Sequence, residues 1–298
     1  MLTSASVFMS LEASLSKIRP HTSSSLAHQK APANLLIALE STLADQGTER
    51  SPTAYFAALL TALESSQSKI SLGDGDLLPA IIYLFALVAP HVPQAVIRSH
   101  LSTLLSLLSP LFPSLVSHAP PLRSHLSFCS AIIQALDVSQ LHTHGVRQTF
   151  TSILDLTLDP RPKVRKKAAD VVRDVLVNAP TPLARHPYAE RVGEWISASL
   201  ASVNSGAASF GRQGKKVQGN DAPEAGIHLI AMAKPIVSYL PNLVSLFDAV
   251  YSRTYITRLA KSGSHIGPSL PPTSWQPISF AGIVQSSLHS HLGANFDF

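Results

Sequence analysis

The feature that most constrains the fold is residues 154–176, where an apolar helix ends, a proline-bounded turn follows and a second helix begins. Pro160 and Pro162 bound the turn, and Pro162 suits the first turn of the helix after it. From Val164 to Leu176 apolar residues recur at i, i+4, i+7, i+8, i+11 and i+12, which forms one continuous stripe along a helix. The stretch therefore predicts a packed helix pair, the unit of a stacked helical repeat.

The same helical spacing continues along most of the chain. Further helices are predicted over residues 34–43, 53–63, 77–88, 95–108, 122–136 and 146–158. The helices come in pairs, with prolines at the breaks, at positions 52, 90/93, 120/121, 160/162 and 180/182. A pair thus recurs at roughly forty residues, the period of HEAT or armadillo units, and no strand alternation interrupts the series. The predicted fold class is an all-α, HEAT/armadillo-like helical-repeat solenoid.

The predicted organisation has five parts. Residues 1–33 form a partly ordered N-terminal segment, 34–203 the HEAT-like repeats, and 204–222 a flexible basic loop rich in glycine. Residues 223–262 form a further helical pair. Residues 263–298 form an irregular tail rich in Pro, Gly and Ser, with one short helix.

Composition excludes several classes of protein. The single cysteine, Cys129, excludes a disulfide framework and is interpreted as a small buried hydrophobe. The most apolar window, residues 77–89, is 13 residues long, whereas a bilayer-spanning helix needs about 20. We therefore expect no membrane segment, and the N-terminus lacks the pattern of a secretory signal.

Positive charge is concentrated in one segment. The net charge is +5, and residues 161–216 contain eleven Lys or Arg against four acidic residues. Lys163, Lys166 and Lys167 begin the second helix of the pair, where cations oppose the helix dipole by a few tenths of a kcal/mol each. A polyanion partner and a merely solvated helix surface both remain open for these lysines. The predicted RNA- or partner-binding residues are Arg161, Lys163, Lys166, Lys167, Arg212, Lys215 and Lys216.

Asp159 and Arg165 have a different predicted role. The spacing Asp159-x-x-x-x-Val164-Arg165-x-x-Ala168 resembles a HEAT-repeat signature, in which an aspartate of the turn and an arginine of the second helix join adjacent repeats. We expect Arg165 to bond to Asp159 or to the next repeat, as a structural ladder. Asp159 is also placed to favour the N-terminal end of the second helix.

No catalytic or metal constellation emerges. His142-x-His144 lacks further ligands, and we interpret it as part of a connecting loop. Residues 211–216 superficially resemble a phosphate loop but lack the required first glycine and the Ser/Thr after the lysine. We therefore predict no enzyme, metal, cofactor or small-molecule substrate, and residues 211–216 stay open as an RNA-contacting segment or a plain linker.

Three runs carry a resemblance to a known family. Residues 158–166 are similar to the signature repeat of the ribosomal RNA processing protein 12 family, and residues 9–21 and 52–60 look like the N-terminal region of its fungal members. The resemblance covers about residues 9–260. It implies a karyopherin-like HEAT solenoid of the nucleolus and nucleus, shuttling to the cytoplasm, that joins pre-ribosomal particles, promotes rRNA processing and assists subunit export. It also implies RNA and the Ran GTPase as partners.

Two functions are therefore expected. In the first, the chain is a non-catalytic scaffold that binds pre-ribosomal RNA and ribosome assembly factors. In the alternative, it is a karyopherin-like transport adaptor that binds Ran or nucleoporins without direct RNA contact.

Overall fold

The computed structural model describes residues 4–66, 71–73, 75–204 and 222–240. Within these ranges the chain forms α-helices and short 3-10 segments and no strand, which confirms the predicted all-α helical-repeat solenoid. The α-helices are α1 (Ser4–Leu15), α2 (Ala27–Asp45), α3 (Pro52–Ser66), α4 (Leu77–Val88), α5 (Gln94–Ser99), α6 (Leu101–Leu115), α7 (Ala119–Ala135), α8 (Val138–Leu141), α9 (His144–Asp155), α10 (Pro162–Val177), α11 (Ala189–Asn204) and α12 (Ala222–Ala233). The 3-10 segments are η1 (Arg19–Ser23), η2 (Ala89–His91), η3 (Leu156–Leu158) and η4 (Lys234–Tyr239).

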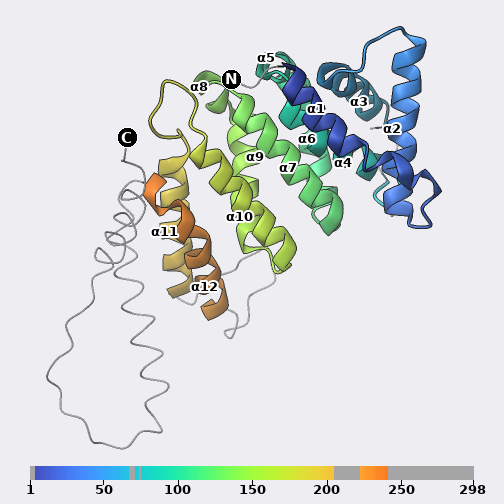
Figure 1. Ribbon diagram of the computed structural model, residues 1–298. Helices are drawn as coiled ribbons and strands as arrows, with labels where there is room; N and C mark the ends of the chain where they lie inside the picture. The colour runs from blue at the N-terminus through green and yellow to red at the C-terminus, as the bar shows by residue number, and fades with distance from the viewer. Residues whose placement is uncertain (1–3, 67–70, 74, 205–221, 241–298) are drawn as a thin grey trace, which may run out of the picture.

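The helices stack as pairs (Figure 1). Helices α2, α4, α7 and α10 form one row in which each packs against the next. Helix α3 packs beside α4, α6 beside α7 and α9 beside α10. Each pair therefore buries its apolar faces against its own partner and against the neighbouring pair, as repeat architectures do.

A continuous apolar core joins the pairs. Phe56 of α3 meets Phe85 of α4 edge to face, with ring centroids 5.6 Å apart. Phe85 in turn stacks on Phe128 of α7, at 4.5 Å. All three rings are buried. Such pairs contribute about 0.5–1.5 kcal/mol beyond the burial of their area.

Proline marks the predicted breaks between helices. Pro52 begins α3, Pro90 lies in η2, Pro120 and Pro121 lie in the first turn of α7, and Pro162 begins α10. These positions need no backbone N–H donor, so proline costs little there.

Helix α6 extends further than the sequence indicated. The predicted helix over residues 95–108 is instead two, α5 and α6, and α6 continues through Pro110 and Pro113. Beyond residue 108, Leu111, Phe112 and Leu115 are buried in the core. Burying such a side chain contributes about 1.5–3 kcal/mol, which offsets the roughly 3 kcal/mol that an interior proline costs.

More of the N-terminal segment is helical than the sequence indicated. Before residue 34 the sequence indicated only a short helix-like run over residues 11–18, whereas α1 begins at Ser4 and α2 at Ala27. Leu11, Leu15 and Ile18 of that run are buried against the core, and this tertiary packing stabilises the segment.

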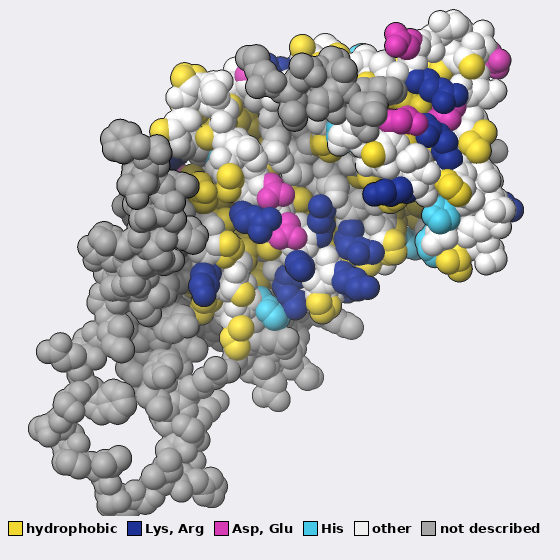
Figure 2. Space-filling model, viewed as in Figure 1, with side chains coloured by type: hydrophobic (Ala, Val, Ile, Leu, Met, Phe, Trp, Pro, Cys, Tyr) yellow, Lys and Arg dark blue, Asp and Glu magenta, His cyan; other side chains and the backbone are white. Residues whose placement is uncertain are grey.

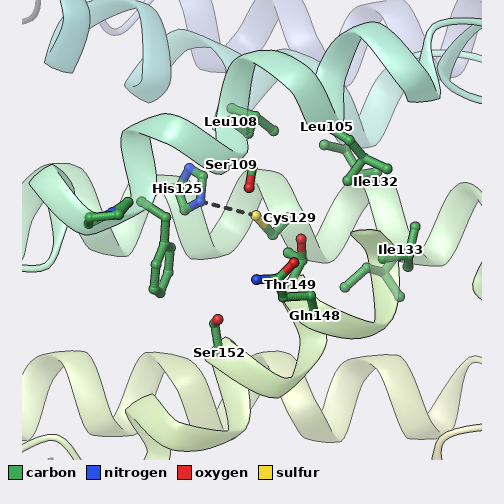
Figure 3. Close-up of a pocket in the computed structure, with 13 residues that line it drawn as sticks. Leu105, Leu108, Ser109, His125, Cys129, Ile132, Ile133, Gln148, Thr149 and Ser152 are labelled. Carbon is green, nitrogen blue, oxygen red and sulfur yellow. Dashed lines mark hydrogen bonds between the residues drawn. The ribbon is translucent and has the colours of Figure 1, made fainter. Parts of the chain in front are cut away.

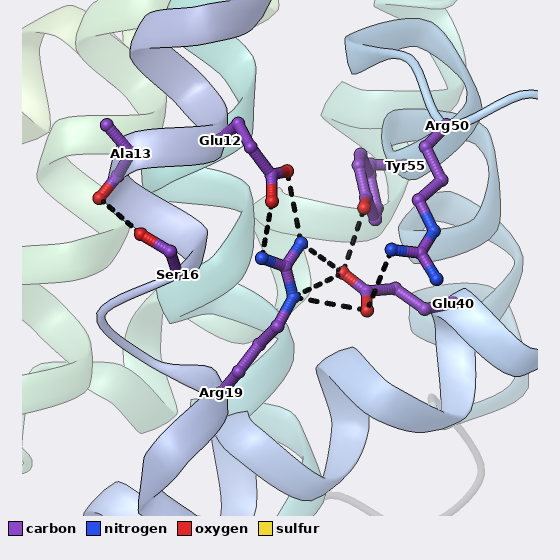
Figure 4. Close-up of polar contacts among 7 residues, drawn as sticks. All are labelled: Glu12, Ala13, Ser16, Arg19, Glu40, Arg50 and Tyr55. Carbon is purple, nitrogen blue, oxygen red and sulfur yellow. Dashed lines mark hydrogen bonds and ion pairs between the residues drawn. The ribbon is translucent and has the colours of Figure 1, made fainter.

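A polar cluster also fixes this segment (Figure 4). The guanidinium of Arg19 donates to both carboxylate oxygens of Glu40 on α2, at 2.7–3.2 Å, and to Glu12 on α1. The hydroxyl of Tyr55 on α3 donates to Glu40 at 2.9 Å, and burial together with this contact to Glu40 raises the pKa of Tyr55 to about 12. Arg50 lies 3.6 Å from Glu40. The cluster therefore links α1, η1, α2 and α3.

Part of the predicted organisation lies outside the described residues. This applies to residues 205–221 of the predicted basic loop and to everything beyond residue 240, including the second helix of the predicted pair over 223–262. The first helix of that pair corresponds to α12 and η4.

Candidate nucleic-acid interface

The turn before α10 is held by Asp159. Its buried carboxylate accepts the backbone N–H of Arg161 at 2.8 Å and both Nε and Nη2 of the Arg161 side chain, at 2.8 and 2.7 Å. Arg165 donates to the backbone carbonyl of Asp159 instead, at 2.8 Å. The expected Asp159–Arg165 contact is thus present through the main chain, while the carboxylate binds Arg161. The carboxylate of Asp159 binds Arg161 because this arginine is only two residues away and presents two parallel N–H donors to the two carboxylate oxygens.

Three lysines follow directly on this rigid turn. Lys163 and Lys166 are exposed, and Lys167 is half-buried, all within the first two turns of α10. In the described part of the chain, no ion pair joins any of the three to an acidic side chain. Val164, Ala168 and Val171 bury the opposite face of the helix. The packed helix therefore holds the three lysines in place, and no ion pair with an acidic side chain neutralises their charge in the described part of the chain.

The lysines line a large groove. It has a volume of about 1340 Å³ and extends across α2, α4, α7 and α10. Among the described residues, the cations that line it are Lys17, Arg123, Lys163, Lys166 and Lys167, which we call the basic groove cations, and the acids are Asp76 and Asp170. Figure 2 shows Lys and Arg side chains gathered over α10 and α7.

Both acids of the groove have partners. Ser71 donates to Asp76 at 2.5 Å, and the backbone N–H of Gly73 also donates to that carboxylate. Asp170 lies 3.6 Å from Arg173, one helical turn away. The groove therefore keeps a positive balance, and a hollow lined by one sign of charge concentrates counter-ions of the other sign.

Arg123 gives the groove an unsatisfied donor. Its Nε is buried and has no acceptor among the described residues. A buried N–H without a partner costs about 1–3 kcal/mol, and more on a charged group. An anion entering the groove can supply the missing acceptor. Three exposed histidines, His21, His28 and His118, line the same groove.

The structure gathers only part of the predicted binding set. Lys163, Lys166 and Lys167 share the groove, whereas Arg161 is paired with Asp159 and does not line it. Arg212, Lys215 and Lys216 lie outside the described residues. Lys17 and Arg123 could not be predicted from the sequence, because single basic residues far apart in the chain become neighbours only when the repeats stack.

A second, smaller hollow contains the single cysteine (Figure 3). It measures about 150 Å³ between α6, α7 and α9. Cys129 is buried, as predicted, and burial raises the pKa of its thiol to about 12. Its Sγ lies 3.4 Å from Nε2 of His125, whose pKa burial lowers to about 4. The pair is therefore uncharged at neutral pH, and this thiol is not a nucleophile.

In the described part of the chain, none of the helices combines the length and the hydrophobicity that a membrane span requires. No group of three or more His, Cys, Asp or Glu side chains there is arranged to hold a metal ion.

Comparison with known proteins gives the family. A family model described as RRP12-like, N-terminal HEAT repeats matches residues 18–246. The chain belongs to the RRP12-like family. Among its relatives, the RRP12-like protein of Gallus gallus is 30% identical over 91% of this chain and 20% of its own length. Ribosomal RNA-processing protein 12 of Saccharomyces cerevisiae is 29% identical over 70% of this chain and 18% of its own.

The human RRP12-like protein is also similar, at 29% identity over 54% of this chain and 12% of its own length. The chain thus spans about a fifth or less of the length of these RRP12-like relatives. No solved structure matches it. The family assignment agrees with the helix pairs described above and with the resemblance found in the sequence.

Proposed function

We propose that this chain is a non-catalytic HEAT-repeat scaffold in ribosome biogenesis, which binds pre-ribosomal RNA in the basic groove. The relatives' names support the process, since the yeast relative is named for ribosomal RNA processing. One structural observation carries the binding proposal: among the described residues, five cations from three separate parts of the chain line one groove, and the Nε of Arg123 there is buried without an acceptor.

The placement of the lysines supports RNA more than a role in folding. Lys163 and Lys166 are exposed at the N-terminal end of α10, where positive charge is unfavourable for the helix itself. Phosphates that approach this end meet the lysines together with the positive end of the helix dipole. Phosphate contacts of this kind dominate the affinity of nucleic-acid-binding proteins.

The remaining functions implied by the family extend this proposal. A scaffold of this process works in the nucleolus and nucleus, and its outer helices offer surfaces for ribosome assembly factors. Subunit export, shuttling to the cytoplasm and binding to Ran or nucleoporins stay predictions from the resemblance.

The test is the salt dependence of RNA binding. The logarithm of the affinity for single strands falls with the logarithm of the salt concentration, with a slope of about 0.7 per neutralised phosphate. A Lys163→Glu/Lys166→Glu/Lys167→Glu variant should therefore bind a pre-ribosomal RNA fragment more weakly and lose about two units of that slope. The matched control carries the same change of charge outside the groove, as Arg147→Glu/Arg185→Glu/Lys234→Glu. An unchanged slope in the first variant, or an equal loss in both, would reject the proposal.

A further inference from the structure

We infer that the basic groove takes single-stranded RNA, with phosphates on its cations and a base stacked on Tyr83. This inference rests on the proposed function and specifies the form of the RNA. The groove has one property that its charge does not explain, namely an exposed aromatic ring in its lining.

Tyr83 lies on α4 and lines the groove with 39% of its surface exposed. The residues on either side of it, Ile82 and Leu84, are fully buried, so the helix fixes its position. Pro79 and Leu87, one turn before and after it, line the same groove and are half-buried. Together they form a flat, largely apolar surface beside a cationic one.

Single-stranded RNA has the chemistry that matches both parts. Modules that bind single strands combine a positively charged groove, which follows the backbone, with aromatic rings on which bases stack. An A-form duplex keeps its bases stacked inside, and its deep, narrow major groove cannot be read by side chains. A duplex could touch the cations but could offer no base to Tyr83.

The order of the helices gives the path of the strand. The cations of α10 and the ring on α4 are separated by α7, which packs against both. Packed helices lie about 8–10 Å apart, so the two ends of the path are on the order of 20 Å apart. Arg123 on α7 lies on this path, with its buried Nε lacking an acceptor. A strand that crosses α7 can place a phosphate there.

The test compares two RNAs with the same number of phosphates. One is an unstructured strand of about 12 nucleotides, within the roughly 4–16 nucleotide site sizes of single-strand modules, and the other is a hairpin whose stem is closed by a non-nucleotide linker, so that it offers no unpaired base. Binding to the full chain is followed by fluorescence anisotropy. We expect the unstructured strand to bind at least about fivefold more tightly, since stacking one base contributes about 1–3 kcal/mol.

Substitution of the ring gives the decisive comparison. Tyr83→Leu should weaken binding of the strand by about 5- to 100-fold and leave the hairpin unchanged, while Tyr83→Phe should retain wild-type affinity. Because Tyr83 is exposed, neither change should unfold the chain, and circular dichroism checks this. Tyr239 is similarly exposed but does not line the groove, so Tyr239→Leu is the matched control.

Three results would overturn the inference. Equal affinity for the hairpin and the strand would reject single-strand binding, and so would equal losses of affinity for both RNAs with Tyr83→Leu. In either case a salt slope that depends on the lysines would still support RNA binding. Tyr83-dependent binding of an acidic peptide without binding of RNA would reject the inference and the proposed function together.

Discussion

Loss of Arg19 should weaken the N-terminal repeats. Its guanidinium bonds to Glu40, a carboxylate only 8% exposed, and to Glu12. In an Arg19→Met variant the alkyl stem still packs, but Glu40 keeps only the hydroxyl of Tyr55 and the more distant Arg50. The variant therefore leaves a buried carboxylate largely unpaired.

The expected cost follows from burial. Removing one partner of a buried ion pair costs about 3–5 kcal/mol. Arg19 is itself 23% exposed, so we expect the lower end, about 3 kcal/mol. Arg50 is 50% exposed and 3.6 Å from Glu40, so Arg50→Met should cost no more than about 1 kcal/mol. Each variant removes one positive charge that faces Glu40, and the two arginines differ chiefly in how deeply they are buried.

Amide hydrogen exchange is the suitable assay, because repeats of a solenoid can open separately. A loss of about 3 kcal/mol corresponds to exchange about 100-fold faster. We expect this acceleration in α1, α2 and α3, no change in α9 or α10, and at most about fivefold acceleration with Arg50→Met. Adding Glu40→Gln to Arg19→Met should recover part of the loss by removing the unpaired charge. Less than tenfold acceleration with Arg19→Met, or equal effects of both variants, would refute the reasoning.

Two further predictions concern the core. Burial lowers the pKa of His125 from 6.5 to about 4, so the unfolded chain binds a proton more readily than the folded one between these values. The free energy of unfolding should therefore fall as the pH drops from about 7 to 5. Urea titrations should show a smaller drop for His125→Gln, and an equal drop would argue against the assignment. The buried hydroxyl of Tyr188 donates to the carbonyl of Leu141 at 2.6 Å, and its ring stacks on Phe150. Tyr188→Phe should keep the stacking and lower the unfolding free energy by about 1–3 kcal/mol, mainly because that carbonyl is left unsatisfied. A change within the error of the urea titration would show that water replaces the hydroxyl.

Local pattern was sufficient to predict much of the fold. The helix pair around Asp159 and the proline boundaries were predictable because a helix stripe and a proline at a helix start each depend on a few adjacent residues. The extension of α6 past Pro110 was not, since it depends on burial of Leu111 and Leu115 against other helices.

The groove was predictable only in part. Lys163, Lys166 and Lys167 stand together in the sequence, and their position at a helix start made a polyanion partner one of the two interpretations that the sequence left open. Lys17, Tyr83 and Arg123 carry no local signal, because each is an ordinary residue of its own helix or turn until the repeats bring them to one groove. The bond between Asp159 and Arg161 likewise depends on turn geometry that spacing alone does not specify.

Ultraviolet crosslinking of a bound single-stranded RNA, mapped by mass spectrometry, tests the central claim most directly. If RNA lies in the basic groove, crosslinked peptides should come from the start of α10, the start of α7, the middle of α4 with Tyr83, and the turn at Lys17. Crosslinks confined to α3, α6 or α9, the helices of the other row, would contradict the account.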